Sequence, residues 1–188
     1  MPAFTSENLE NNAIGATLAL MAAAARTAPK AMGIDALEIF ALDGAEKQEI
    51  ADVMKTLAIE GDPSAEKWLR DAGNVEIADA LFVIGLKKHA GSAGANCQGC
   101  GHASCVEFGK APKISATFRG PTCAFKLVDL GIAIGSAVKA AGILNVDNRI
   151  MFRAGAAIMK SQWGAKLSIA FATPLRISGK SPFFDRQV

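Results

Sequence analysis

The sequence predicts an α/β (α+β) fold that is rich in helix and has a small sheet. Its 188 residues are 51% hydrophobic and 20% charged, which supplies enough apolar material for one sizeable core in a single domain, residues 1–188. Two apolar runs, residues 35–42 and 79–86, both begin with Asp-Ala-Leu and are separated by segments with helical periodicity. Such strands between helices are typical of a layered architecture of helices on a sheet.

Each expected element follows from its local pattern. Ser6 can cap the first helix, and because residues 13–25 carry no charge, we expect that helix to be buried on most sides. Asp43 and Glu46 form a capping-box pattern at the start of the second helix. Pro174 is expected to end the last strand and to begin an irregular tail. In order, the sequence predicts helix 6–26, strand 35–42, helix 43–60, short helix 62–69, strand 79–86, helical turn 103–109, helix 124–144, helix 148–161 and strand 166–173.

Composition and charge argue against several classes of protein. The longest uncharged apolar stretch, residues 13–25, is shorter than the roughly 20 residues that cross a bilayer. We therefore expect no membrane span. The first basic residue, Arg26, follows that stretch instead of preceding it, so a secretory signal is not expected and the cytoplasm is the expected location. The net charge of +2 and the absence of Tyr argue against nucleic acid as a partner.

The cysteines are the strongest chemical signal in the chain. Three thiolates within nine residues can cover one face of an inorganic cluster, and a fourth can close the site from a later loop. Gly99 and Gly101 give the segment flexibility, and their amides and that of Gln98 could also approach the sulfurs and hydrogen-bond them. All four cysteines of the chain follow the spacing Cys-x2-Cys-x4-Cys-x17-Cys: Cys97, Cys100, Cys105 and Cys123.

Several kinds of site compete for these cysteines. A disulfide pair is disfavoured in a chain that is expected to be cytoplasmic and is large enough to hold itself together. Zinc sites usually show two Cys pairs or two Cys with two His, whereas here one Cys-x2-Cys pair occurs and His89 and His102 are poorly placed. A [4Fe-4S] cluster bound by all four cysteines fits best and predicts electron transfer or the redox module of an oxidoreductase. A non-enzymatic, metal-stabilised interaction module remains as an alternative.

Basic side chains surround the cysteines. Residues 87–126 contain six bases and one acid, Glu107, a local net charge of +5. Because a thiolate-ligated cluster is negatively charged, these cations favour its reduced form and could attract an acidic redox partner such as a ferredoxin. His102 is expected to be either a hydrogen-bond donor to the cluster ligands or a solvated neighbour of them, rather than a catalytic base. The six bases are Lys87, Lys88, Lys110, Lys113, Arg119 and Lys126.

The stretch around the cysteines resembles one group of proteins, and the whole chain resembles another. Residues 95–101 (Ala-Asn-Cys-Gln-Gly-Cys-Gly), with Cys105 and Cys123 after them, resemble the segment of Rnf complex B subunits and of the corrinoid iron-sulfur protein that binds [4Fe-4S]. This resemblance implies an iron-sulfur segment over residues 90–125. The whole chain is similar to a family of small bacterial and archaeal ferredoxin-domain-containing proteins of unknown function. The matching stretches are residues 24–30, 120–126, 129–133 and 144–149.

The order of elements resembles that of nitroreductase-type flavoproteins. The resemblance rests on residues 24–30, on the helix containing residues 129–135, and on the late strand ending Ala-Thr-Pro. This resemblance implies a nitroreductase-like frame with an inserted iron-sulfur loop. It also implies an alternative function, that of an FMN-dependent reductase in which the cluster relays electrons. Since no base precedes Arg26, Arg26 and Lys30 are the candidates for the FMN phosphate. Their alternative role is to neutralise the C-terminal end of a helix.

The two most apolar helices predict an oligomer. Residues 13–25 and 124–144 are apolar around almost their whole circumference, and Gly131 and Gly135 permit close backbone approach. One domain of this size buries one such helix more easily than two. We therefore expect a homodimer or a larger homo-oligomer, in which a second copy covers the surplus apolar surface.

Overall fold

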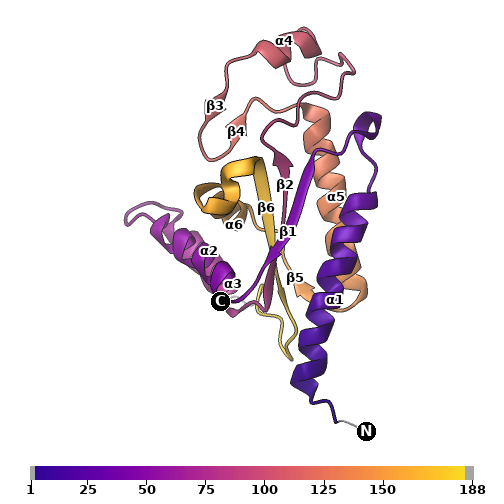
Figure 1. Cartoon of the computed structure of the whole chain (residues 1–188). Coiled ribbons are helices and arrows are strands. Elements are labelled where there is room, and N and C mark those ends of the chain that lie inside the picture. Colours follow the sequence, from indigo (N-terminus) through magenta and orange to yellow (C-terminus); the bar gives the residue numbers. More distant parts are fainter. Residues whose placement is uncertain (1–2, 185–188) are drawn as a thin grey trace.

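Figure 1 shows the computed structural model, in which residues 3–184 are described. Residues 1–2 and 185–188, which the predicted domain includes, lie outside the described part. The helices are α1 (Ser6–Thr27), η1 (Ala31–Gly33), α2 (Gly44–Thr56), α3 (Ala65–Ile77), α4 (Cys105–Lys110), α5 (Ala124–Ile143), α6 (Phe152–Lys160) and η2 (Gln162–Lys166). The strands are β1 (Leu37–Leu42), β2 (Ala80–Lys87), β3 (Ile114–Ser115), β4 (Arg119–Gly120), β5 (Asp147–Asn148) and β6 (Leu167–Arg176).

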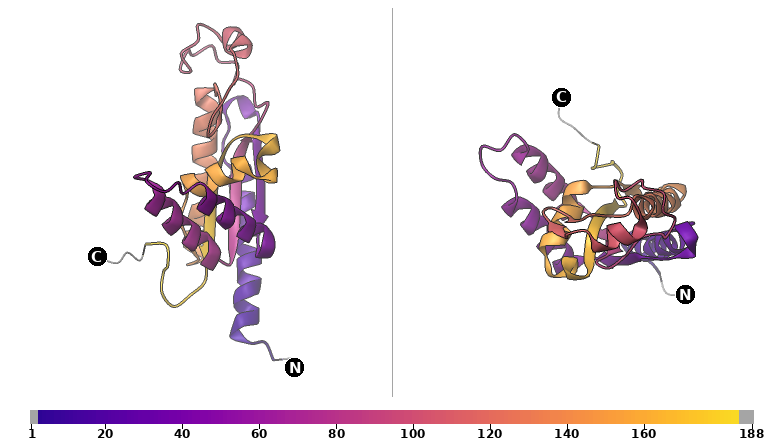
Figure 2. Two further views of the ribbon diagram at one scale, coloured as in Figure 1. Left: turned by 90° about the vertical axis from the view of Figure 1, so that its left-hand side faces the viewer. Right: turned by 90° about the horizontal axis from the view of Figure 1, so that it is seen from above.

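Three layers form the body of the molecule. The central sheet is antiparallel, with the strand order β1-β2-β6-β5. α1 and α5 lie side by side on one face of it, and α2, α3 and α6 cover the other face (Figures 1 and 2). The predicted helix-rich α+β fold with a small sheet is therefore confirmed.

Strand β2 shows why the sheet needs helices on both sides. Phe82 and Ile84 pack into the core beneath α1 and α5, whereas Leu81 and Val83 pack into the core beneath α2 and α6. Successive side chains of a strand point to opposite faces, so both faces of β2 are buried. This explains the unbroken apolar run that predicted the strand. The two Asp-Ala-Leu runs become direct neighbours, since β1 pairs with β2 along its whole length.

The predicted end of the last strand before Pro174 is wrong, because β6 continues to Arg176. A proline has no backbone N–H to donate, so its place in a sheet depends on which side its nitrogen faces. Ala172 exchanges backbone hydrogen bonds with Met151 on the β5 side of the strand. The alternation of a strand points the nitrogen of Pro174 to that same side, where the pairing with β5 is interrupted. The proline therefore displaces no sheet hydrogen bond.

Several helix boundaries also differ from the predictions. α1 is capped by Thr5, whose hydroxyl accepts from the N–H of Asn8, rather than by Ser6. Asp43 is the N-cap of α2 but makes no side-chain cap hydrogen bond. α3 extends well beyond its predicted end, because its second half packs Val75 into the core. α6 begins later than predicted, since residues 147–148 form strand β5 instead.

The expected burial of α1 on most sides is wrong for the single chain. α1 buries only one stripe, which includes Ile14 and Met21, and leaves Leu20 51% exposed. α5 likewise leaves an apolar stripe in solvent that includes Val128 and Ile132.

Across residues 3–184, these and the other helices lack the combination of length and hydropathy that a bilayer-spanning segment needs.

Candidate metal centre

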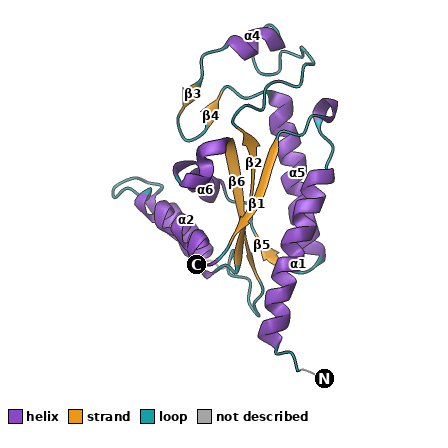
Figure 3. Ribbon diagram, viewed as in Figure 1, coloured by secondary structure: helices purple, strands orange, loops and turns teal. Residues whose placement is uncertain are grey.

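The cysteine segment, residues 88–123, leaves the end of β2 and returns to the start of α5. Figure 3 shows it as loops, α4 and the β3–β4 hairpin, extending beyond one end of the sheet. All four cysteine side chains line one pocket, although Cys123 comes from a different stretch of the segment than the other three. The pocket is also lined by Ser92, Ala93, Ala95, Gln98, His102, Ser104, Ala124 and Phe125.

Left-handed backbone positions shape the loop around Cys97. Asn96 and Gln98 have φ angles of 47° and 59°, and Gly101 has a φ of 80°. Asn tolerates this conformation better than most residues, and Gly adopts it freely. The turn directs the N–H of Asn96 to the sulfur of Cys105 at 3.3 Å, while the Asn96 side chain accepts from the N–H of Cys105 at 2.8 Å. Asn96 thus ties the two ends of the three-cysteine loop together.

Hydrogen bonds to its sulfur lower the pKa of Cys105. The hydroxyl of Ser92 makes the largest contribution, and the backbone N–H of Asn96 adds to it. Both donors stabilise the thiolate over the thiol. Because a thiolate is the form that binds metal, this arrangement prepares Cys105 to act as a ligand.

Cys123 stands at the N-terminus of a long helix. It is 5% exposed and is the N-cap residue of α5, whose first residues, Ala124 and Phe125, line the same pocket. The positive end of the helix dipole therefore faces the four sulfurs and favours negative charge there. Gly99 lies against this helix end: a Cβ at that position would be 3.4 Å from the Cβ of Ala124.

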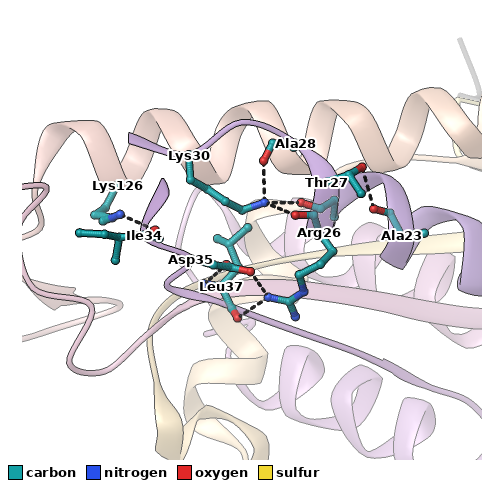
Figure 4. Close-up of polar contacts among 10 residues, drawn as sticks. Ala23, Arg26, Thr27, Ala28, Lys30, Ile34, Asp35, Leu37 and Lys126 are labelled. Atoms are coloured by element: carbon teal, nitrogen blue, oxygen red, sulfur yellow. Dashed lines mark hydrogen bonds and ion pairs between the residues drawn. The ribbon is translucent and has the colours of Figure 1, made fainter. Parts of the chain in front are cut away.

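A buried ion pair supports the start of α5. Lys126 is fully buried, and its Nζ lies 3.1 Å from Oδ2 of Asp129. The same Nζ donates to the carbonyl of Ile34 at 2.7 Å, a contact drawn in Figure 4. Asp129 in turn accepts from the N–H of Ala31 at 2.8 Å. Ala31 packs against the small apolar cluster that contains Cys123. The pair thus fixes the η1 turn beside the pocket.

The predicted basic face is smaller than the sequence indicates. Lys126 is buried and neutralised by Asp129, so it adds no charge to the surface. Arg119 is half-buried and donates from Nη1 to the carbonyls of Gly164, at 2.7 Å, and Leu167. Of the six bases in residues 87–126, those that stay exposed are Lys87, Lys88, Lys110 and Lys113.

The histidines differ in their relation to the cysteines. His102 lines the cysteine pocket and packs edge-on against Phe108, with ring centroids 5.7 Å apart. Neither His102 nor the exposed His89 makes a side-chain hydrogen bond to a cysteine among residues 3–184. In that described part, no three His, Cys, Asp or Glu side chains gather tightly enough to hold one metal ion.

Arg26 and Lys30, the candidates for an FMN phosphate, both make local contacts (Figure 4). Arg26 forms an ion pair with Asp35 and donates to the carbonyl of Leu37 at 3.3 Å. The Nζ of Lys30 donates to the carbonyls of Ala25, Arg26 and Ala28, at the end of α1. The bonds of Lys30 match the alternative role of a cation that neutralises a helix C-terminus, whereas those of Arg26 link the end of α1 to Asp35 and β1. Neither side chain lines the cysteine pocket.

The sequence did not reveal Ser92 and Asn96. It predicted that the amides of Gln98, Gly99 and Gly101, rather than that of Asn96, approach a sulfur. Both missed residues act on Cys105 from earlier in the same loop. The usable signal was the Asn immediately before Cys97, since Asn is enriched at left-handed positions. No sequence pattern marked Ser92, because its hydroxyl reaches the sulfur only through the folded path of the loop.

The sequence has a relative across almost its entire length. A protein of Archaeoglobus fulgidus, described as an uncharacterized protein, is 42% identical over 180 residues, which cover 96% of this chain and 95% of the relative. Residues 119–186 match the family described as "Uncharacterized protein containing a ferredoxin domain (DUF2148)". The chain belongs to this family. The matched residues include Cys123, while the other three cysteines precede them.

Solved structures of nitroreductases share the fold. A nitroreductase with bound FMN from Desulfitobacterium hafniense superposes with a TM-score of 0.56 at 18% identity, over 95% of this chain and 81% of that one. The nitroreductase CinD from Lactococcus lactis, in complex with chloramphenicol, gives 0.57 at 13% identity, over 92% and 84%. The expected nitroreductase-like frame is therefore confirmed as the fold.

Proposed function

We propose that the protein binds one [4Fe-4S] cluster through Cys97, Cys100, Cys105 and Cys123 and serves as an electron carrier or as the redox module of an oxidoreductase. One observation carries this proposal: four thiols from two stretches of the chain line a single pocket. The ferredoxin domain in the family description supports a redox role. When bound, a cluster of this type supplies reversible one-electron transfer.

The surrounding residues suit this group. Ser92 and Asn96 donate hydrogen bonds to the sulfur of Cys105, which stabilises the thiolate and is one determinant of cluster potential. The N-terminus of α5 adds positive potential beside Cys123. The exposed lysines of the segment add more. Together these groups favour the more negative, reduced state of the centre.

Elemental analysis of protein purified without oxygen tests the proposal directly. We expect about four iron and four sulfide per chain and an electron paramagnetic resonance signal on reduction. One zinc per chain with no sulfide would reject the cluster. That result would instead support a metal-stabilised interaction module.

An FMN-dependent reductase, with the cluster as electron relay, is the second candidate. The fold favours it, and so does an apolar cavity of about 600 Å³ beside the cysteine pocket, lined in part by Ile114, Phe118 and Ile169. Such a cavity suits the flat ring system of a flavin. Extraction of denatured protein tests this candidate: an absorption band at about 450 nm that survives destruction of the cluster indicates a flavin. Its absence from protein incubated with FMN rejects the candidate.

A second copy of the chain is the partner we propose for the exposed stripes of α1 and α5. Val128 and Ile132 on α5 and Leu20 on α1 are each more than 40% exposed. A two-fold interface between identical stripes is the commonest way to cover such a surface. Light scattering at micromolar concentration should give about twice the 19.5 kDa chain mass. A mass near 19.5 kDa would exclude the dimer.

An acidic ferredoxin-type protein is the proposed redox partner. Lys87, at the end of β2, and Lys110, on the cysteine segment, are exposed and can attract a negatively charged surface. The rate of electron transfer from a reduced acidic ferredoxin should fall steeply as salt is raised, because salt screens such attraction. A rate that is independent of salt would exclude this docking mode.

A further inference from the structure

A second cavity lies directly beside the cysteine pocket. Its volume is about 340 Å³, which is within the range of roughly 300 to 1,000 Å³ for small-molecule sites. Ser92, Cys105 and Cys123 line both this cavity and the cysteine pocket. A molecule in this cavity would therefore lie against two of the four proposed cluster ligands.

The lining of this cavity is basic. It contains Lys88, His89, Lys113 and Arg119, and no Asp or Glu is among the described residues that form it. The basic lining does not follow merely from the positive charge of residues 87–126, because three of the six bases in that stretch, Lys87, Lys110 and Lys126, lie elsewhere. Three of the six bases are thus gathered at one hollow. Converging positive groups in a partly enclosed site favour a negatively charged ligand.

Two of these charges contact other groups of the fold. The bonds from Nη1 of Arg119 to the carbonyls of Gly164 and Leu167 fix its guanidinium in the cavity wall. The Nζ of Lys113 lies 5.2 Å from the ring centroid of Phe108, a buried side chain that also lines the cavity. Among residues 3–184, neither base forms an ion pair with a carboxylate. Both charges are therefore available to a ligand, and Arg119, which is already held by its hydrogen bonds, needs little ordering when the ligand binds.

We propose that this cavity binds a small oxyanion, a carboxylate or phosphate compound, beside the Cys105 and Cys123 side of the centre. Lys88 and Lys113 provide charge-assisted hydrogen bonds, and Arg119 provides a fixed positive charge behind them. The proposal concerns binding, and no bond is made or broken in it. The anion site rests on the cavity alone, whereas its influence on a cluster rests on the proposed function.

Calorimetric titration of cluster-loaded protein with malonate, and separately with inorganic phosphate, tests the proposal. We expect one binding site per chain for at least one probe, and a change in the electron paramagnetic resonance spectrum of the reduced centre when it is filled. The double variant Lys88→Gln, Lys113→Gln should weaken binding by about tenfold or more, because two charged donors are lost.

The matched control is Lys87→Gln, Lys110→Gln, which removes the same charge from exposed lysines outside the cavity. Its affinity for the probe should change less than about twofold, since exposed charges at a distance are screened. Far-ultraviolet circular dichroism should show all variants folded, as each change is at the surface.

Three outcomes would overturn the anion site. The first is that neither probe binds, and the second is that both double variants lose the same affinity for the probe. The third is that the cavity substitutions weaken binding of an acidic protein while neither small anion binds. Failure of the proposed function gives a different result. Protein that contains zinc and no sulfide, yet binds the probe with the expected variant pattern, supports the anion site and rejects the cluster.

Discussion

The three-layer body and the cysteine segment are built by different forces. The body contains two large apolar clusters, one on each side of the sheet, in which β2 is buried on both faces. Within the segment, the apolar cluster consists of Ala93, Phe108 and Cys123, with Ala31 and Cys100 packed against it. Polar contacts around the sulfurs shape its loop instead. The body therefore gains its stability from apolar burial, whereas we expect the segment to depend on what its cysteines bind.

The largest expected effect on the body comes from its central strand. Phe82 is 1% exposed, and Phe82→Ala should lower the free energy of unfolding by about 3–5 kcal/mol, because it leaves a cavity under α1 and α5. Urea unfolding measures the loss. Ile114→Ala, at an exposed position of the cysteine segment, is the control and should change stability by less than about 0.5 kcal/mol. Comparable losses in both variants would contradict the distinction between the regions.

A slightly smaller effect is expected at the junction of the two regions. Asp129→Asn leaves Lys126 charged and buried without its partner, which typically costs about 3 kcal/mol. Removing both charges, in Lys126→Met with Asp129→Leu, should restore much of the stability measured by urea unfolding. If the double variant is as unstable as the single one, the buried charge is not the cause.

Loss of a cysteine should affect the segment and spare the body. Cys123→Ser should lower the iron content of anaerobically purified protein, because it removes a proposed ligand. Amide hydrogen exchange of residues 88–123 should become faster, while that of β2 and β6 changes little. Unchanged iron content would mean that another residue is the fourth ligand. Faster exchange throughout β2 would mean that the body depends on the centre.

The smallest effect is expected from the ion pair at the start of β1. Burial raises the pKa of Asp35, but hydrogen bonds from Arg26 and the N–H of Leu37 outweigh it and hold the pKa below 3.8. A lowered carboxyl pKa adds stability above about pH 3.8, and this contribution is lost as the pH falls through the folded-state pKa.

Asp35→Asn should therefore cost less than about 1 kcal/mol near neutral pH, since the pair is partly exposed and screened by solvent. The difference from the unchanged protein should shrink as the pH falls below 3.8. Urea unfolding at several pH values measures this trend. Glu60→Gln, at an exposed position, controls for the loss of charge alone. A difference that grows toward acid would contradict the assigned direction of the pKa.

Local patterns were sufficient for most of the body. The apolar run of residues 79–86 predicted strand β2, helical periodicity located α2, and the long apolar stretch of residues 124–144 located α5. Features that depend on distant partners were not predictable. Pro174 continues β6 because the pairing with β5 is interrupted beside it. Lys126 is buried because Asp129 and the carbonyl of Ile34 accept hydrogen bonds from its Nζ. Periodicity describes one segment at a time and carries no information on such partners.

The candidate metal centre also combines features that the sequence predicted with features that depend on the folded path of the chain. The spacing of the cysteines predicted that they belong together, and the structure lines one pocket with all four. Ser92 and Asn96 could not be assigned, because their role depends on the path of the loop and not on a spacing. The outward apolar stripe of α5 was predicted only in the sense that some partner must cover it.

The position of β6 in the chain bears on how the protein is assembled during synthesis. β2 ends at Lys87 and its neighbour β6 begins at Leu167, so the sheet cannot close until nearly the whole chain has been made. All four cysteines leave the ribosome before β6 does. For that interval they are carried on a chain without its central sheet, which is the stage at which exposed thiols and apolar strands are most open to side reactions and aggregation. We therefore expect correct maturation to require either prompt closure of β6 or protection of the nascent cysteines by another protein.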